Sequence, residues 1–141
     1  MIQEAHIDES FPKEYMLCSK KVLEQLHAKG FSFHKFPFTL KLAFLEDSSP
    51  RPFQVVLSIP KRRVPKAHDR NKIKRRTKEA LRKNKSQLES FLQEHELHLC
   101  FMVIFSTHKM LEFIEIEKQM IKALTQVIDT IKQHENQIPT L

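Results

Sequence analysis

One stretch of nine residues, Leu97–Phe105, limits the possible folds more than any other part of the sequence. It is almost uniformly apolar and rich in residues that favour β-strands. A strand with one face in water alternates polar and apolar residues, whereas a continuously apolar strand is covered on both faces. The sequence therefore predicts a central strand buried between layers of other elements.

Two further segments alternate apolar side chains with smaller or more polar ones, namely Phe38–Phe44 and Phe53–Ile59. This period of two is typical of strands with one packed face. A short strand is also expected at Phe31–Phe36. The Ser-Ser-Pro-Arg-Pro sequence before Phe53 indicates a turn, so we expect the two alternating strands to pair as an antiparallel hairpin.

Helices are expected on either side of these strands. Ser19 can cap a helix over Leu17–Lys29, and Gly30, the single glycine of the chain, stands where a left-handed C-cap is common. A second helix is expected from an N-cap at Asp69 through Leu88, because its apolar residues fall in one arc at about 100° per residue. That arc comprises Ile73, Thr77, Ala80, Leu81 and Leu88.

A last helix is expected over Phe113–Gln133. Its apolar residues recur at intervals of three and four, which favours packing on the sheet over a cofactor-binding role. Together these elements indicate an α+β fold.

The chain has 141 residues, of which 40% are hydrophobic, and this suits a single domain with one core. We expect the domain to span residues 11–134, with flexible ends at 1–10 and 135–141. No apolar run is long enough to cross a bilayer, and the first residues lack a secretory signal, so a cytoplasmic protein without a membrane partner is expected. Cys18 and Cys100 lie in apolar contexts and are expected to be buried, reduced thiols.

The positive charge of the chain is concentrated in Lys61–Lys85. This segment holds thirteen Lys or Arg against Asp69 and Glu79, a net charge of +11, so with +7 overall the remaining residues carry −4. A polyanion is the natural partner of such a segment, because neutralised phosphates release their counterions. The alternative is an ordinary solvated helix face.

The cations of the second helix fall on an arc next to its apolar arc. The predicted helix therefore has one apolar stripe and one cationic stripe. The second stripe comprises Asn71, Lys74, Arg75, Lys78, Arg82 and Lys85.

The sequence lacks the residue patterns that several classes of enzyme require. With one glycine the chain has neither a Walker loop nor a dinucleotide fingerprint. His95 and His98 beside two glutamates could suggest a metal cluster, but a solvated turn explains them better. Glu112, Glu115 and Glu117 could suggest a metal nuclease, but they suit the start of a helix. We therefore expect no catalytic residue and no metal site in the protein itself.

The sequence Arg70-Asn71-Lys72-Ile73-Lys74-Arg75, continued by Lys78-Glu79-Ala80 and Arg82, resembles the Arg-Asn-Arg signature helix of the bacterial ribonuclease P protein component family. The preceding strand ending in Ser58, followed by Lys61-Arg62, is also similar. Further matches at Phe11, Met16–Ser19, Lys29-Gly30 and Phe36-Pro37, and in the last strand and helix, extend the resemblance over about residues 11–133.

The resemblance implies an αβββαβα fold with a four-stranded mixed sheet, three helices and a left-handed βαβ crossover, similar to a ribosomal protein domain. It implies a protein subunit that assists an RNA catalyst in removing the 5′ leader of precursor tRNA. The partners implied are the catalytic RNA and precursor tRNA, with no obligatory protein partner. Mg²⁺ would be bound mainly by the RNA subunit. The alternative is a ribosomal or RNA-assembly protein of the same fold.

The resemblance also implies two sites. Contacts with the catalytic RNA are expected at Lys61, Arg62, Lys66, Arg70, Asn71, Lys72, Lys74, Arg75, Lys78 and Arg82. A cleft for the single-stranded leader is expected at Leu23, His27, Thr39, Lys41 and Ser58, and strand alternation independently places the last three opposite the packed faces.

The sequence departs from the family at a few of these positions. Lys72 replaces the second Arg of the signature, Pro65 replaces a common glycine and His68-Asp69 replace small or aliphatic residues. Leu23 and His27 stand where aromatic side chains are frequent.

Overall fold

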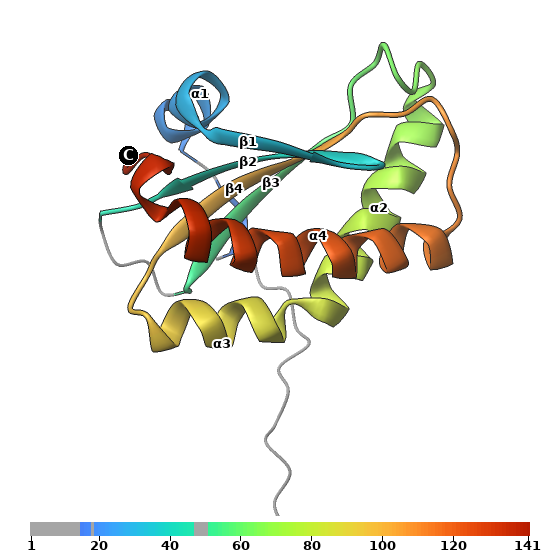
Figure 1. The fold of residues 1–141 in the computed structure, drawn as a ribbon. Coiled ribbons are helices and arrows are strands. Elements are labelled where there is room, and N and C mark those ends of the chain that lie inside the picture. Colours follow the sequence, from blue (N-terminus) through green and yellow to red (C-terminus); the bar gives the residue numbers. More distant parts are fainter. Residues whose placement is uncertain (1–14, 18, 47–50) are drawn as a thin grey trace, which may run out of the picture.

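The computed structural model describes residues 15–17, 19–46 and 51–141. Figure 1 shows the arrangement of the elements, a sheet with α1 on one side and the other helices on the opposite side. The expected flexible residues 1–10, and Cys18, lie outside the described residues. In chain order the elements are α1 (Lys20–Lys29), β1 (Phe31–Lys35), β2 (Phe38–Phe44), β3 (Phe53–Ser58), α2 (Ala67–Asn84), α3 (Ser86–Glu94), β4 (Leu99–Phe105), α4 (Phe113–His134) and the 3-10 turn η2 (Glu135–Gln137).

The four strands form one mixed sheet in the order β1-β2-β4-β3. β4 is antiparallel to β2, from Phe38 opposite Phe105 to Phe44 opposite Leu99, and parallel to β3. All but one of the β4 residues are buried. The prediction of a central, fully covered strand is confirmed.

The predicted hairpin between β2 and β3 is wrong, because β4 lies between them. β3 pairs with β4 in parallel, from Phe53 opposite Leu99 to Ser58 opposite Ile104. Alternation states which face of a strand is packed but does not name its neighbour. A strand as apolar as β4 removes the most surface from water when it has a neighbour on each edge and a layer on each face.

The two faces of the sheet differ in what covers them. On one face Leu40, Val55 and Phe101 belong to the main core with residues of α2, α3 and α4. On the other face Cys100 and Met102 form a smaller core with Leu26 of α1. α1 covers only part of this face, which leaves room for a site beside it.

The described part of the chain holds four α-helices where three were expected, because the predicted second helix is interrupted at Lys85. Lys85 was expected on the cationic stripe, but its side chain is completely buried. Its Nζ lies 3.3 Å from Glu89 Oε1 and 5.2 Å from the centroid of the Tyr15 ring. Tyr15 also donates its hydroxyl hydrogen to Glu89. A buried ammonium is costly without such partners. The break between α2 and α3 places Lys85 beside Glu89 and Tyr15.

Two predicted helix ends also differ in detail. Ser19 caps α1 as predicted, since its Oγ accepts the N–H of Val22 at 3.2 Å. Gly30 is not left-handed, with φ −56° and ψ 143°. Glycine is required there for space, because a Cβ would lie 2.5 Å from the Leu26 carbonyl oxygen. The N-cap position of α2 is Lys66, whose side chain makes no capping hydrogen bond, so the prediction of Asp69 as the N-cap is wrong. Asp69 lies in the first turn, where the helix dipole favours a carboxylate.

The segment after α4 packs beside β2. The Phe44 N–H donates to the Pro139 carbonyl at 2.8 Å, and the Leu141 N–H donates to the Phe44 carbonyl at 2.8 Å. Ile138 is buried in the main core. In the part of the chain that the structure describes, no helix combines the length and apolarity needed to cross a bilayer.

Candidate nucleic-acid interface

α2 divides into an apolar stripe and a cationic stripe, as predicted. Ile73, Thr77, Ala80 and Leu81 are buried against the core. On the neighbouring arc four residues of the expected RNA-binding set are exposed, namely Asn71, Lys74, Arg75 and Lys78. The helix is thus anchored by one side and presents these polar side chains to solvent.

The remaining flank of α2 is attached to the start of α4. Arg76 donates to the Leu111 carbonyl at 2.7 Å and lies 3.8 Å from a Glu112 carboxylate oxygen. The Lys83 ammonium lies 5.7 Å from the centroid of the Phe113 ring. These two cations hold α2 against α4, so the exposed cationic stripe is on the flank that faces away from α4.

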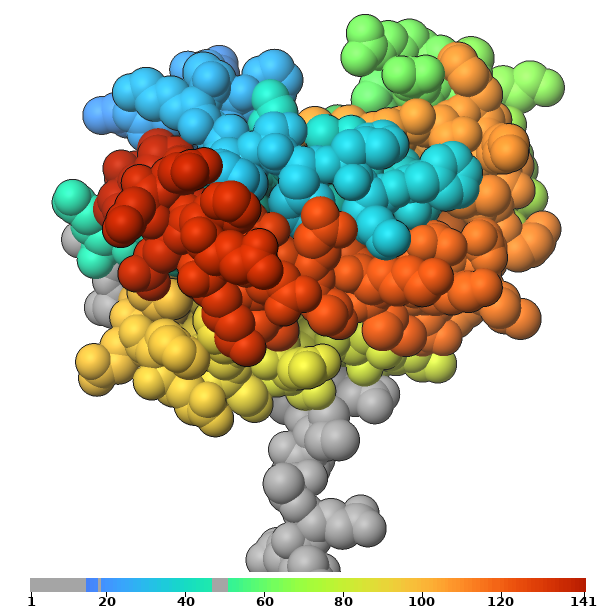
Figure 2. Space-filling model, viewed as in Figure 1, coloured from blue at the N-terminus to red at the C-terminus, as the bar shows by residue number. Residues whose placement is uncertain are grey.

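The connection between β3 and α2 projects beside this stripe. In Figure 2 it forms the green lobe at the upper right, separated by a notch from the blue atoms of α1. It carries Lys61, Arg62 and Lys66 of the expected RNA-binding set, and all three are exposed. The loop cations of that set therefore directly precede the N-terminal end of α2, along which the helix cations follow.

Arg70, which also belongs to the expected RNA-binding set, is hydrogen-bonded to the loop before α2. Its Nη1 donates to the carbonyl oxygens of Val64 at 3.1 Å and Pro65 at 2.7 Å. Its guanidinium therefore joins the first turn of α2 to the preceding loop. The His108 ring nitrogen Nδ1, 3.1 Å from the Arg63 carbonyl, holds the same loop from the other side.

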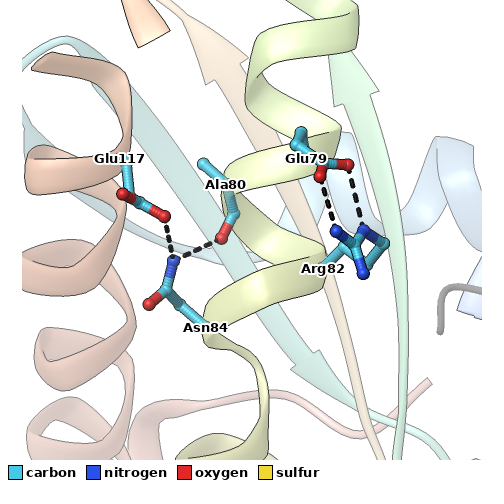
Figure 3. A network of polar contacts seen from close by, with 5 residues as sticks. All are labelled: Glu79, Ala80, Arg82, Asn84 and Glu117. Carbon is cyan, nitrogen blue, oxygen red and sulfur yellow. Dashed lines mark hydrogen bonds and ion pairs between the residues drawn. The ribbon is translucent and has the colours of Figure 1, made fainter. Parts of the chain in front are cut away.

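Two other residues of the RNA-binding set are less exposed than the rest. Lys72 is half-buried. Arg82 makes two hydrogen bonds to the Glu79 carboxylate, at 3.0 and 2.5 Å, which are drawn in Figure 3. The bond from Arg82 lowers the pKa of Glu79 from its usual value. This ion pair reduces the net charge at the end of the stripe.

A cleft of about 590 Å³ lies between α1 and the end of β3. Three of the five expected leader-binding residues line it: Leu23, His27 and Ser58. The rest of the lining consists of four apolar residues, Val56, Leu57, Ile59 and Met102, and the charged residue Glu24. Sequence reasoning did not name these residues, although two signals indicated some of them. Val56 is two residues from Ser58 and therefore lies on the same face of β3, and Glu24 lies one helical turn from His27.

Thr39 and Lys41 lie on the expected sheet face but do not line the cleft. Thr39 Oγ1 is 2.9 Å from Ser106 Oγ and 3.0 Å from His34 Nδ1. Lys41 Nζ donates to the His27 carbonyl oxygen at 2.6 Å. Both side chains are therefore bonded to neighbouring parts of the protein.

The structure also describes most of the residues that were considered for metal binding or catalysis. Among the residues the structure describes, no group of three His, Cys, Asp or Glu side chains could hold a metal ion. His95 Nδ1 lies 2.9 Å from the Phe91 carbonyl at the end of α3. Cys100 is a free, buried thiol, as expected, and burial raises its pKa to about 12. A thiol with that pKa is a poor nucleophile at neutral pH.

The chain is similar to members of one known protein family. Residues 11–128 match the family described as Ribonuclease P. The Ribonuclease P protein component of Porphyromonas gingivalis is 25% identical over 121 residues, 84% of this chain and 87% of that protein. The RNase P protein of Staphylococcus aureus has a TM-score of 0.57 at 19% identity, covering 80% of this chain and 94% of that one. The RNase P protein from Thermotoga maritima has a TM-score of 0.61 at 16% identity, covering 79% of this chain and 96% of that one.

The two structural matches show a common fold. The family match covers most of the chain and includes the cationic helix, the sheet and the cleft. The chain therefore belongs to the ribonuclease P protein component family, whose members are the protein subunit of a tRNA-processing endoribonuclease.

Proposed function

We propose that the exposed cations of α2 and of the loop before it bind the catalytic RNA, while the cleft beside α1 holds the 5′ leader of precursor tRNA. The observation that carries this proposal is the position of the cations. The buried stripe of α2 anchors the helix to the core and leaves cations of the neighbouring arc in solvent. The exposed cations are Lys61, Arg62 and Lys66 on the loop and Lys74 and Arg75 on α2. A surface of this kind attracts phosphates and releases their counterions.

The cleft supports the second half of the proposal. It adjoins the cationic loop, since Ile59 lines it and Lys61 follows two residues later. Its apolar lining suits an unpaired nucleobase, which a single strand can present but a duplex cannot. An RNA running from the loop into the cleft would thus place phosphates near cations and a base against apolar side chains.

The chemical step belongs to the RNA subunit in this proposal, and the protein contributes binding and orientation. Mg²⁺ would be held mainly by the RNA, since the described protein residues do not gather a set of ligands that fits it. The complex would act in the cytoplasm on precursor tRNA without an obligatory protein partner. We also propose a domain over residues 11–134, against which the segment 135–141 packs beside β2. As in the family, we propose a left-handed crossover from β3 to β4.

The test is reconstitution with a bacterial ribonuclease P RNA and cleavage of precursor tRNA at low Mg²⁺. Replacing Lys74 and Arg75 with alanine should remove most of the stimulation by the protein. The matched control replaces Lys118 and Lys122, two exposed cations of α4, and should retain stimulation. Equal activity of the two double variants would contradict the proposed surface.

The same assay tests the alternative of a ribosomal or assembly protein. Such a protein would bind structured RNA through the same cations but would not stimulate cleavage by the ribonuclease P RNA. The proposed function therefore fails if wild-type protein binds that RNA and leaves the cleavage rate unchanged.

A further inference from the structure

The charge of the cleft is opposite to that of the surface beside it. Glu24 is the single Asp, Glu, Lys or Arg among the lining residues that the structure describes. The other lining residues are apolar, apart from His27 and Ser58. Among these described lining residues, a phosphate would meet the carboxylate of Glu24 and no lysine or arginine. The cleft is therefore unsuited to the backbone of a nucleic acid, although the adjoining loop suits it well.

Lys41 could have supplied the missing cation, because it pairs with the lining residue Met102 across the β2 and β4 strands. Its ammonium instead donates to the His27 carbonyl at 2.6 Å. Cations are favoured at this end of a helix by the helix dipole. The ammonium of Lys41 is thus held at the end of α1 and does not compensate the charge of Glu24.

The Glu24 carboxylate has acceptor capacity that the protein does not use. In the described parts of the chain, no side chain or backbone N–H donates to it and no cation pairs with it. It lies one turn before His27 on α1, so both side chains belong to the same wall of the cleft. A ligand that enters against the apolar floor would therefore find an unpaired acceptor at its edge.

We infer that Glu24 is a specificity residue that favours a leader base with an exocyclic amino group over uracil. This inference rests on the proposed binding of the leader in the cleft. Adenine, cytosine and guanine carry an amino group that can donate to a carboxylate, and single-stranded bases expose these edges. Uracil has no amino group, and the one N–H of its Watson–Crick edge lies between two carbonyl oxygens that the Glu24 carboxylate repels. The apolar floor contacts the face of the base, while the phosphates lie toward Lys61 and Arg62.

Cytidine and uridine provide the sharpest comparison, because their bases have nearly the same shape and differ in the amino group. Precursor tRNAs would carry cytidine or uridine at each leader position in turn, and their dissociation constants would be measured with reconstituted holoenzyme. At one position wild-type enzyme should bind the cytidine form at least about fivefold more tightly. With Glu24→Gln the ratio should fall to about one, because the amide can donate to uracil as well as accept from cytosine.

The matched control is Glu94→Gln, which makes the same charge change at an exposed position of α3. It should keep the wild-type ratio. The inference is overturned if no position discriminates cytidine from uridine, or if Glu24→Gln keeps the wild-type ratio. A substrate without a leader separates this failure from that of the proposed function. If leader-bearing and leaderless substrates bind equally, the cleft does not hold the leader and both proposals fail.

Discussion

The ammonium of Lys41 donates to the backbone carbonyl oxygen of His27 at 2.6 Å, so a strand in the middle of the sheet is bonded to the end of α1. Gly30 allows the close approach, because its absent Cβ would lie 3.1 Å from Lys41 Cβ. Two residues that sequence analysis assigned to leader binding are therefore bonded to each other. Their bond fixes the wall of the cleft relative to its floor.

Replacing Lys41 with methionine should loosen this wall while retaining most of the side-chain volume. We expect the free energy of unfolding to fall by about 1 kcal/mol, the usual size of one hydrogen bond plus a favourable dipole interaction. In the holoenzyme, KM for leader-bearing substrate should rise while kcat changes little, and Lys41→Arg should restore much of the binding. The control is Lys122→Met, which replaces an exposed cation in the middle of α4, away from either helix end, and should alter neither quantity.

Substitutions of Arg70 and Arg75 should have different effects, the first on the stability of the fold and the second on RNA binding. Arg70→Ala removes both hydrogen bonds to the loop carbonyls, so we expect a loss of about 1 to 2 kcal/mol in urea unfolding. Amide hydrogen exchange in residues 61–66 should become faster. Arg75→Ala should leave stability and exchange unchanged and weaken RNA binding. A stable Arg70→Ala protein with wild-type exchange would show that the loop does not depend on this guanidinium.

Binding of the catalytic RNA should depend steeply on salt. With about five phosphate contacts, the log of the binding constant should fall against the log of salt concentration with a slope of roughly −3 to −5. Replacing Lys74 and Arg75 together should make this slope less negative by about 1.4 to 1.8, because each phosphate contact releases about 0.7 to 0.9 of a counterion. Filter binding at several salt concentrations measures both slopes. A flat response would exclude a phosphate-binding surface.

Glu79 should weaken RNA binding by neutralising Arg82. Glu79→Gln removes the ion pair and one negative charge from the stripe, so we expect RNA affinity to rise about two- to fivefold at moderate salt. The matched control is Glu94→Gln on α3. An unchanged affinity for Glu79→Gln would mean that this end of α2 does not meet RNA.

The same pair predicts a small pH dependence of stability. The pKa of Glu79 is lowered in the folded protein, chiefly by its bond to Arg82, so the pair stabilises the fold above the unfolded value near 4.5. That contribution is lost as pH falls through the lower, folded pKa. Because both side chains are partly exposed to solvent, which screens their interaction, the difference between wild type and Glu79→Gln should be at most about 0.5 kcal/mol at neutral pH and vanish in acid. Urea unfolding across this pH range measures it.

Periodicity was sufficient to predict the strands, the last helix and the two stripes of α2. Alternation and helical spacing report which side of an element is buried, and burial dominates the stability of each element. Periodicity could not predict which strands pair with each other. β3 carries the same alternating pattern whether it joins β2 in a hairpin or pairs with β4 in parallel.

The individual roles of long cationic side chains were also beyond sequence reasoning. Lys85 has the same angular position as the exposed cations, but its helix ends there and its ammonium is buried beside Glu89. Arg70 belongs to the family signature, but its guanidinium reaches back to the loop. A long flexible side chain can place its charge several ångströms from its Cα, so its partners depend on the folded surroundings.

The backbone bonds that join Leu141 and Pro139 to Phe44 offer a position for a fluorescent reporter. Phe44 is at one end of β2, and Thr39 is toward the other end. Thr39 pairs with Ile104 of β4, which also pairs with Ser58 of the cleft. At about 3.4 Å per residue these two ends are separated by roughly 17 Å. A dye attached after Leu141 would therefore be near enough to sense an acceptor on the leader by energy transfer, without obstructing its entry.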